Sequence, residues 1–152
     1  MRESHLRGVV LSLLREAGLH AMAVENSACP GTPDVEYGGE ATLEYATGSI
    51  LQETRAGWIE LKQLARLPVR AETPLRIPKF RREQRIWLDQ RWRSGGEAHL
   101  LLVAGTDWIL WDGKQAADLG RAPVPLSDAL TLARDRWTRK PSHVAFLDAL
   151  RR

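Results

Sequence analysis

Residues 57–64, GWIELKQL, constrain the fold of this chain most, because apolar and polar side chains alternate from Ile59 to Lys62. This alternation predicts a β-strand that buries Ile59 and Leu61 on one face. Glu60 and Lys62 then share the opposite face, about 7 Å apart. A salt-bridged, solvated face would use the same pair, so the strand alone leaves chemistry and structure both open.

Helix and strand signals alternate along the rest of the chain. Helical spacing of apolar residues over 3–17 predicts a helix that ends at Gly18. The segment 38–57 alternates weakly, as a hairpin would. Ser127 and Ser142 are predicted N-caps of helices over 128–139 and 143–151. Further strands are predicted at 20–25, from Asp34 onward, at 98–105 and at 107–113. A proline-broken basic loop is predicted at 65–80 and a helix at 81–94.

This order predicts an α/β domain with a mixed central sheet flanked by helices. The length of 152 residues suits one hydrophobic core. We therefore expect a single domain over 1–152, with its core at about 3–113 and a C-terminal helical extension at about 125–152.

The composition is that of an ordinary globular protein, with 43% hydrophobic and 27% charged residues. No apolar run is long enough for a membrane span, and the N-terminus lacks the pattern of a signal peptide. The single cysteine, Cys29, allows neither an internal disulfide nor a zinc site by itself and is expected to be a small buried residue. We expect a cytoplasmic, intracellular protein without a membrane partner.

Charge is distributed unevenly along the chain. Residues 1–54 carry 3 basic and 8 acidic side chains, whereas residues 55–93 carry 11 basic and 4 acidic ones. A basic middle third beside an acidic first third is typical of proteins with a polyanionic partner, although a solvated helix face is the alternative.

Asp34 is a second carboxylate that could act together with Glu60 and Lys62. It follows Pro33 at a predicted strand start, and it approaches Glu60 if the two strands are neighbours. Two nearby carboxylates repel each other unless a cation lies between them, and oxygen ligands suit Mg²⁺ or Mn²⁺. Lys62 would then orient the attacking water or neutralise charge during phosphodiester hydrolysis.

The residues GTPDV, followed after 22 intervening residues by WIELKQ, resemble the motif of the PD-(D/E)xK nuclease superfamily. The short form of this motif has Gly-x-Pro-Asp, then Glu-x-Lys, then a helix that carries a glutamine. In this form the sequence is similar to the virus-type replication–repair nuclease (VRR-NUC) family. The resemblance covers roughly residues 3–111 and implies a restriction-endonuclease-like core with αβββαβ order and extra C-terminal helices. The spacing between Asp34 and Glu60 exceeds the family's usual spacing, so residues 38–57 are interpreted as an insertion.

The resemblance also implies roles for individual residues. Asp34, Glu60 and the Leu61 carbonyl would be metal ligands and Lys62 the catalytic lysine. Glu3 matches an additional ligand and Gln84 the family's glutamine. For Glu3 the alternative is a favourable charge at a helix N-terminus, and for Gln84 a hydrogen-bonded core amide. Glu36 shares the strand face of Asp34, but we do not expect it to be a ligand.

Seven basic residues follow the predicted catalytic strand and are expected to contact DNA phosphates. They are Arg66, Arg70, Arg76, Lys79, Arg81, Arg82 and Arg85. Trp87 and Trp92 are expected to pack rather than stack on bases. Trp108 and Trp111, three residues apart in one strand, face opposite sides, so one of them is expected at an exposed edge or an interface.

The function expected from these features is a Mg²⁺- or Mn²⁺-dependent endonuclease, and the resemblance implies that it cuts branched DNA such as a Holliday junction. The resemblance, together with the two-fold symmetry of such a junction, implies a homodimer with two sites. The alternatives are a nuclease acting on flaps, ends or linear duplex, a non-catalytic DNA-binding subunit that retains the fold, and an enzyme acting on a small phosphoester. No phosphate-binding loop of the G-x-x-x-x-G-K-[ST] type is present, so an ATP-driven motor is not indicated.

Overall fold

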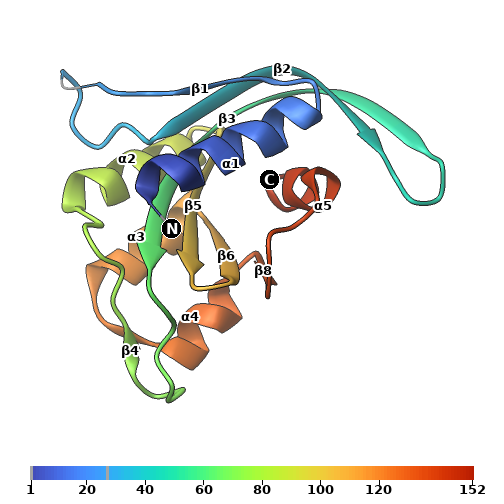
Figure 1. Cartoon of the computed structure of the whole chain (residues 1–152). Helices are drawn as coiled ribbons and strands as arrows, with labels where there is room; N and C mark the ends of the chain where they lie inside the picture. The colour runs from blue at the N-terminus through green and yellow to red at the C-terminus, as the bar shows by residue number, and fades with distance from the viewer. Residues whose placement is uncertain (1, 27) are drawn as a thin grey trace.

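A twisted six-stranded sheet runs through the computed structural model, which describes residues 2–26 and 28–152 (Figure 1). Only β3 and β5 are parallel, and every other neighbouring pair is antiparallel. The order across the sheet is β1 (His20–Ala23), β2 (Val35–Glu44), β3 (Ile50–Leu64), β5 (Glu97–Ala104), β6 (Asp107–Asp112) and β8 (Asp135–Trp137). The sheet is therefore mixed, as the sequence predicts.

Helices cover both faces of this sheet. Helices α1 (Glu3–Glu16) and α5 (His143–Ala149) pack on the face that buries Ile59 and Leu61. The other face, with Leu100 and Leu102, is covered by α2 (Arg82–Arg93), α3 (Gly113–Arg121) and α4 (Leu126–Leu132). A small second sheet pairs β4 (Pro74–Leu75) with β7 (Val124–Pro125). Because β3 is central, both of its faces are enclosed by protein along the residues that carry Glu60 and Lys62.

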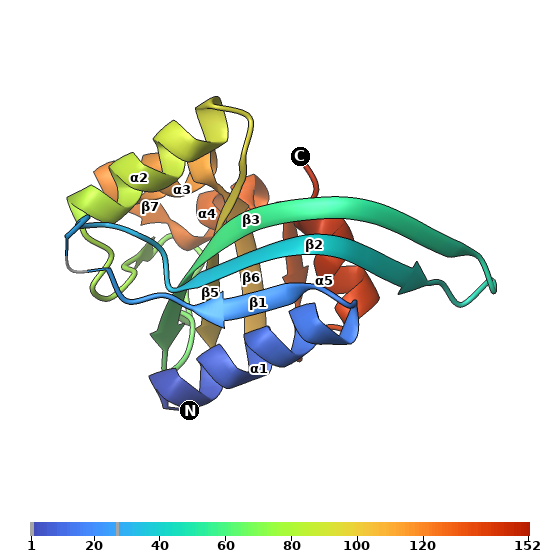
Figure 2. The same ribbon diagram turned by 90° about the horizontal axis from the view of Figure 1, so that it is seen from above.

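The predicted hairpin is confirmed and is longer than the sequence indicates. Strands β2 and β3 pair from Val35 with Ile59 to Glu44 with Ile50. Strand β1 pairs with β2 only as far as Gly38, and β5 pairs with β3 only from Gly57. The outer half of the hairpin therefore projects beyond the other strands as a two-stranded arm (Figure 2).

A buried ionic network ties this arm to α5. The Arg55 side chain, only 5% exposed, donates to Glu97 at 2.8 Å, to Glu53 at 2.9 Å and to the Leu147 carbonyl at 2.9 Å. Arg151, just after α5, pairs with Glu53. Buried charges need such complete pairing, so the network fixes the arm relative to the C-terminal segment.

The prediction of a helix over 128–139 is wrong beyond Leu132, where α4 ends. Residues Asp135–Trp137 instead form β8, which pairs with β6. The free edge of β6 accounts for the change, since it offers backbone partners that a longer helix could not use. Ser127 lies inside α4 rather than at its N-cap, whereas Ser142 is confirmed as an N-cap, with its Oγ accepting from Ala145 N at 3.1 Å.

Three further features differ from expectation. Trp108 and Trp111 do face opposite sides, but both are buried because helices cover each face. Cys29 is exposed. Helix α3 was not predicted, although Asp112 and Gln115 form a capping box at its start, a pattern readable in the sequence. Within the described ranges, no helix is both long and apolar enough to cross a membrane.

Candidate active site

Asp34 lies where the β2–β3 ladder ends. The last paired residues are Val35 and Ile59, so the edge of β3 beyond Ile59 is free of β2. The Asp34 carboxylate occupies this place and accepts a hydrogen bond from Leu61 N at 2.9 Å. In an extended strand the N–H and C=O of one residue point the same way, which directs the Leu61 carbonyl to the same edge. Sequence reasoning expected Asp34 and Glu60 to converge, and the pairing of β2 with β3 brings them together.

Glu60 is buried, with an exposed fraction of 1%. Its Oε1 accepts from Gln84 Nε2 at 3.0 Å and from Lys62 Nζ at 3.1 Å. Its Oε2 is buried and receives no hydrogen bond from any residue that the structure describes. Burial, reinforced by the negative charge of Asp34, raises the pKa of Glu60 to about 8 despite the attraction of Lys62. The pocket therefore disfavours the Glu60 carboxylate until a further positive charge arrives.

Lys62 is held by two acceptors. Besides Glu60, its ammonium donates to the backbone carbonyl of Lys79 at 2.9 Å. Lys79 has a φ of 59°, and it is the one non-glycine residue with positive φ among those described. Such a conformation is costly and persists where the surroundings impose it. Sequence reasoning missed this role of the Lys79 backbone, and no side-chain pattern signals it.

Gln84 bridges helix α2 and the site. While its Nε2 donates to Glu60, its Oε1 accepts from Arg81 N at 2.9 Å and so caps the first turn of α2. The loop before Asp34 packs on this turn, because a Cβ on Gly31 would lie 2.4 Å from the Glu83 carbonyl oxygen. Gly31 also has a φ of 90°, which favours glycine. The amide expected to face inward is thus in contact with the acidic pair.

Glu3 lies near these residues but does not join them. It lines a small cavity of about 160 Å³ with Lys62, Gln63 and Lys79, between the start of α1 and the loop before α2. Within the part of the chain that the structure describes, no three His, Cys, Asp or Glu side chains are grouped closely enough to hold a metal ion. The ligand role of Glu3 stays a prediction.

The donor set of the site fits a hard divalent cation. Asp34, Glu60 and the Leu61 carbonyl offer oxygen atoms alone, the ligand type that Mg²⁺ and Mn²⁺ prefer. Mg²⁺ keeps several waters, so two protein carboxylates suffice. The unpartnered Oε2 of Glu60 and the raised pKa of that side chain are both relieved by a cation at this position.

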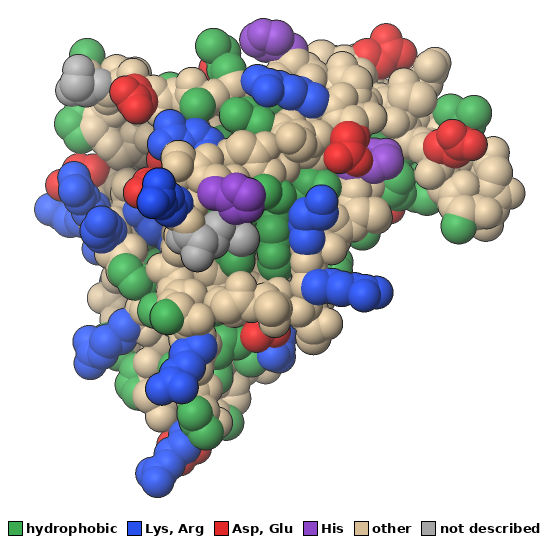
Figure 3. Space-filling view, in the orientation of Figure 1, with side chains coloured by type: hydrophobic (Ala, Val, Ile, Leu, Met, Phe, Trp, Pro, Cys, Tyr) green, Lys and Arg blue, Asp and Glu red, His purple; other side chains and the backbone are tan. Residues whose placement is uncertain are grey.

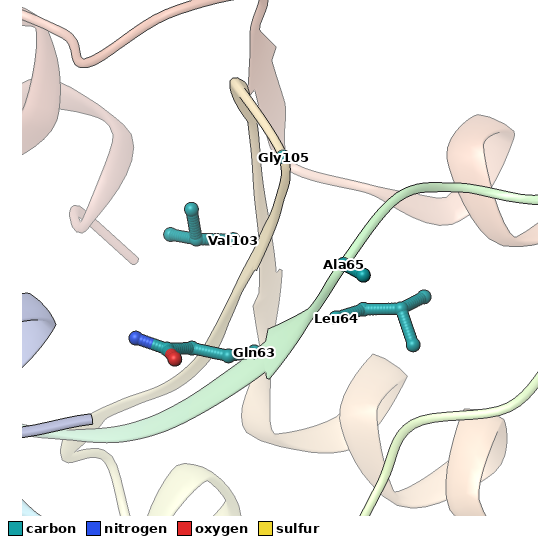
Figure 4. Close-up of a pocket in the computed structure, with 5 residues that line it drawn as sticks. All are labelled: Gln63, Leu64, Ala65, Val103 and Gly105. Atoms are coloured by element: carbon teal, nitrogen blue, oxygen red, sulfur yellow. The ribbon is translucent and has the colours of Figure 1, made fainter. Parts of the chain in front are cut away.

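The end of β3 beyond the site is held by the turn between β5 and β6. Gly105 N donates to the Leu64 carbonyl at 3.1 Å. A surface depression of about 310 Å³ lies here, lined by Gln63, Leu64, Ala65, Val103 and Gly105 (Figure 4). Its lining carries no ionisable side chain, so we assign it no chemistry. The hydrogen bond from Gly105 to Leu64 fixes the end of β3, where the chain enters the basic loop of residues 65–80.

The seven predicted basic residues lie on this loop and on the start of α2. Arg66, Arg70, Arg76, Lys79, Arg81 and Arg82 are exposed. Arg85 is partly buried, and its aliphatic stem packs against Gly120. Figure 3 shows Lys and Arg side chains gathered at the left and lower parts of the molecule, where Figure 1 draws α2 and β4. A basic surface therefore extends from the acidic pair along the loop.

The tryptophans expected to pack do so. Trp87 packs edge-on against Trp58 with ring centroids 5.0 Å apart, and Arg91 lies 4.9 Å from the Trp87 ring centroid. Trp92 contacts the buried His99 and lies under Arg152, whose guanidinium is 3.9 Å from the ring centroid. Trp58 shares the strand face of Glu60, so this cluster supports the wall of the site.

Comparison with known proteins yields a structural likeness. No protein-family model matches the sequence, and no curated protein matches it. Among solved structures, the chain is similar to that of Hjc, a Holliday junction resolvase from the archaeal hyperthermophile Archaeoglobus fulgidus. The two share 18% identity and superpose with a TM-score of 0.52 over 94% of this chain and 98% of the resolvase chain. The likeness establishes the fold, and the restriction-endonuclease-like class expected from the sequence is confirmed.

Proposed function

We propose that this protein is a metal-dependent endonuclease that hydrolyses DNA phosphodiester bonds and selects branched DNA. The carrying observation is the convergence of Asp34, Glu60 and Lys62 at the free edge of β3, with a buried Glu60 oxygen to which no described residue donates a hydrogen bond. The proposed placement in the PD-(D/E)xK superfamily, closest to the VRR-NUC family, is supported by the order of these motifs along the chain.

In this proposal the chain's own residues bind and orient the scissile phosphate. Asp34, Glu60 and the Leu61 carbonyl would hold Mg²⁺ or Mn²⁺, which lowers the pKa of bound water and offsets charge on the phosphate. The attacking water gives up one proton as its oxygen bonds to phosphorus, the bond from phosphorus to the leaving sugar oxygen breaks, and that oxygen takes up a proton. Lys62 stabilises the added negative charge. Gln84 and the Lys79 carbonyl keep Glu60 and Lys62 in place.

Selection of branched DNA is supported by the fold shared with a Holliday junction resolvase and by the exposed basic surface. Phosphate contacts bind without reading sequence. A homodimer would present two sites to a four-way junction, and sedimentation in the presence and absence of junction DNA tests this part of the proposal.

The cleavage test compares four substrates, namely a four-way junction, a flap, a linear duplex and a plasmid, with Mg²⁺, Mn²⁺ or a chelator. We expect preferential cleavage of the junction with metal and none with chelator. Asp34→Asn and Lys62→Ala should lower the rate by at least about 100-fold. Glu40→Gln changes an exposed carboxylate on β2, the strand that follows Asp34, and as the matched control it should cleave normally.

Each other outcome has a definite meaning. Preferred cleavage of flaps or linear ends would replace the branched substrate by those forms. Unchanged cleavage by Lys62→Ala and Glu60→Gln would show that the observed activity does not arise at this site. Binding of junction DNA without cleavage by the unmodified protein would favour a DNA-binding subunit.

A further inference from the structure

The turn at residues 67–71 in the basic loop presents an apolar tip. Val69 is 92% exposed, more than any other large hydrophobic residue that the structure describes. The next most exposed is Ile50, at 64%. Exposed apolar side chains are common singly, so the surroundings of Val69 decide its meaning.

The tip is rigidly anchored. On its C-terminal side, Thr73 O accepts from Leu126 N at 2.9 Å and Ala71 O accepts from Ser127 N at 3.0 Å. The β4–β7 pairing follows directly, with Leu75 buried at its end. On the N-terminal side, Leu64 is bound to the β5–β6 turn. Pro68 adds a fixed φ immediately before Val69. The tip thus loses little conformational entropy when it binds a partner.

Three arginines flank the tip, and one exposed carboxylate, Glu72, lies in the same loop. Arg66 and Arg76 line with Leu67, Pro68 and Val69 a shallow groove of about 390 Å³, and Arg70 follows Val69 directly. Figure 3 shows hydrophobic and basic side chains interleaved at the lower tip of the molecule. An apolar point among arginines matches a polyanion that also offers an apolar surface, which is what nucleic acid presents where base pairs are unstacked.

The tip is within reach of a duplex cut at the site. Val69 is seven residues beyond Lys62, so the chain spans at most about 24 Å between them. This equals about seven base pairs at 3.4 Å each. One DNA arm that lies on the basic residues would therefore reach both the acidic pair and the tip.

We propose that Val69, with Pro68, is a wedge that inserts between bases at a DNA branch point. The proposal rests on the proposed function and specifies how the substrate is selected. Insertion into continuous duplex requires unstacking of a base step. At a branch the stacking is already interrupted, so the wedge is accommodated there at lower cost. The arginines bind both kinds of DNA, whereas Val69 favours the branched form.

The test measures binding of a four-way junction and of a linear duplex of equal length at one salt concentration in chelator, so that no cleavage occurs. Val69→Ser should weaken junction binding about tenfold, the loss expected for one buried valine, and leave duplex binding within about twofold. Val69→Ile should retain the preference. Ile50→Ser, the same kind of change on the distant hairpin, is the control and should alter neither affinity.

A fluorescent base analogue at the branch adds a direct readout. Its emission should rise when the unmodified protein binds, and the rise should be lost with Val69→Ser. Equal weakening on both DNAs, or no change on either, would overturn the wedge while the proposed function stands. If Val69→Ser changed the self-association of the protein and left DNA binding unchanged, that result would also overturn the wedge. Failure of the unmodified protein to bind any DNA would instead refute the proposed function.

Discussion

Glu60 combines burial, a neighbouring carboxylate and one oxygen without a partner. Its pKa of about 8 means that the folded, metal-free protein holds a proton there that the unfolded chain releases near pH 4.5. A bound cation favours the carboxylate, so metal binding must release this proton below pH 8.

Metal affinity should therefore rise with pH up to about 8, by up to about tenfold per unit, and level off above it. Titration calorimetry with Mn²⁺ in buffers of different ionisation enthalpy measures the released protons. Asp34→Asn removes the repelling charge and should reduce the proton release as well as the affinity. Affinity that does not vary between pH 6 and 8 would contradict this view of Glu60.

The proton on Glu60 also determines how the free energy of unfolding depends on pH. Because the folded pKa of Glu60 is raised, its stabilising contribution is present below about pH 4.5 and lost as the pH rises through about 8. In chelator, Glu60→Gln should reduce this decline and unfold at a higher denaturant concentration than the unmodified protein at pH 8. A steeper decline for Glu60→Gln in urea titrations would be inconsistent with a protonated Glu60.

His99 is a second buried titratable group, fully enclosed beside Trp92, and neither of its ring nitrogens has a hydrogen-bond partner within residues 2–26 and 28–152. Burial, with the charges of Arg134, Arg55 and Arg152, lowers the pKa of His99 to about 3. The neutral ring contributes stability that is present above about pH 6.5 and lost as the pH falls towards 3. His99→Leu should flatten the acid limb of a stability profile recorded by circular dichroism. An unchanged acid limb would show that other groups cause acid unfolding.

At the level of elements, the loop before Asp34 depends on contact between Gly31 and the first turn of α2. Gly31→Ala adds both backbone strain and a clash with Glu83. Gly48→Ala, in the hairpin turn, adds similar strain at a φ of 87° but meets nothing within 4 Å. We expect about 1 kcal/mol of destabilisation for Gly48→Ala and about 2 kcal/mol more for Gly31→Ala. Equal losses in denaturant unfolding would mean that the loop does not pack on α2.

The hairpin arm and the C-terminal helix form a second coupled unit through Arg55. Arg55→Ala leaves Glu97 and Glu53 without their buried partner and should cost about 3–5 kcal/mol. Arg93→Ala removes an exposed pair with Asp89 and should cost under about 1 kcal/mol. Thermal unfolding of the two variants provides the comparison, and similar values would argue against the network.

Elements with strong local patterns were predictable, whereas those set by long-range pairing were not. The alternation of 57–64 and the helical spacing of 3–17 identify β3 and α1. Strand β8 was missed because three residues carry no periodic signal and form a strand only beside β6. Within the site, Asp34, Glu60, Lys62 and Gln84 could be found from motif order. The Lys79 carbonyl could not, since its role comes from backbone conformation.

For the whole molecule, the uneven charge of the sequence becomes a spatial separation. The acidic Glu40, Glu44 and Glu53 lie on the projecting arm, while the basic loop and α2 flank the site. If the six exposed basic residues contact phosphates, the slope of log affinity against log salt should approach about −5 for duplex DNA. Arg76→Ser with Arg82→Ser should reduce the slope by about 2, whereas Arg139→Ser with Lys140→Ser should not alter it. A slope near zero in fluorescence anisotropy would exclude this surface as the DNA contact.

The central claim is that Asp34 and Glu60 hold one divalent cation at the free edge of β3. Crystals grown with Mn²⁺ and measured at its absorption edge test it directly. We predict an anomalous peak about 2.2 Å from a carboxylate oxygen of each residue and from the Leu61 carbonyl. The peak should be absent in Asp34→Asn. A Mn²⁺ peak bound elsewhere, with Glu60 still paired to Lys62 as in the metal-free protein, would contradict the account.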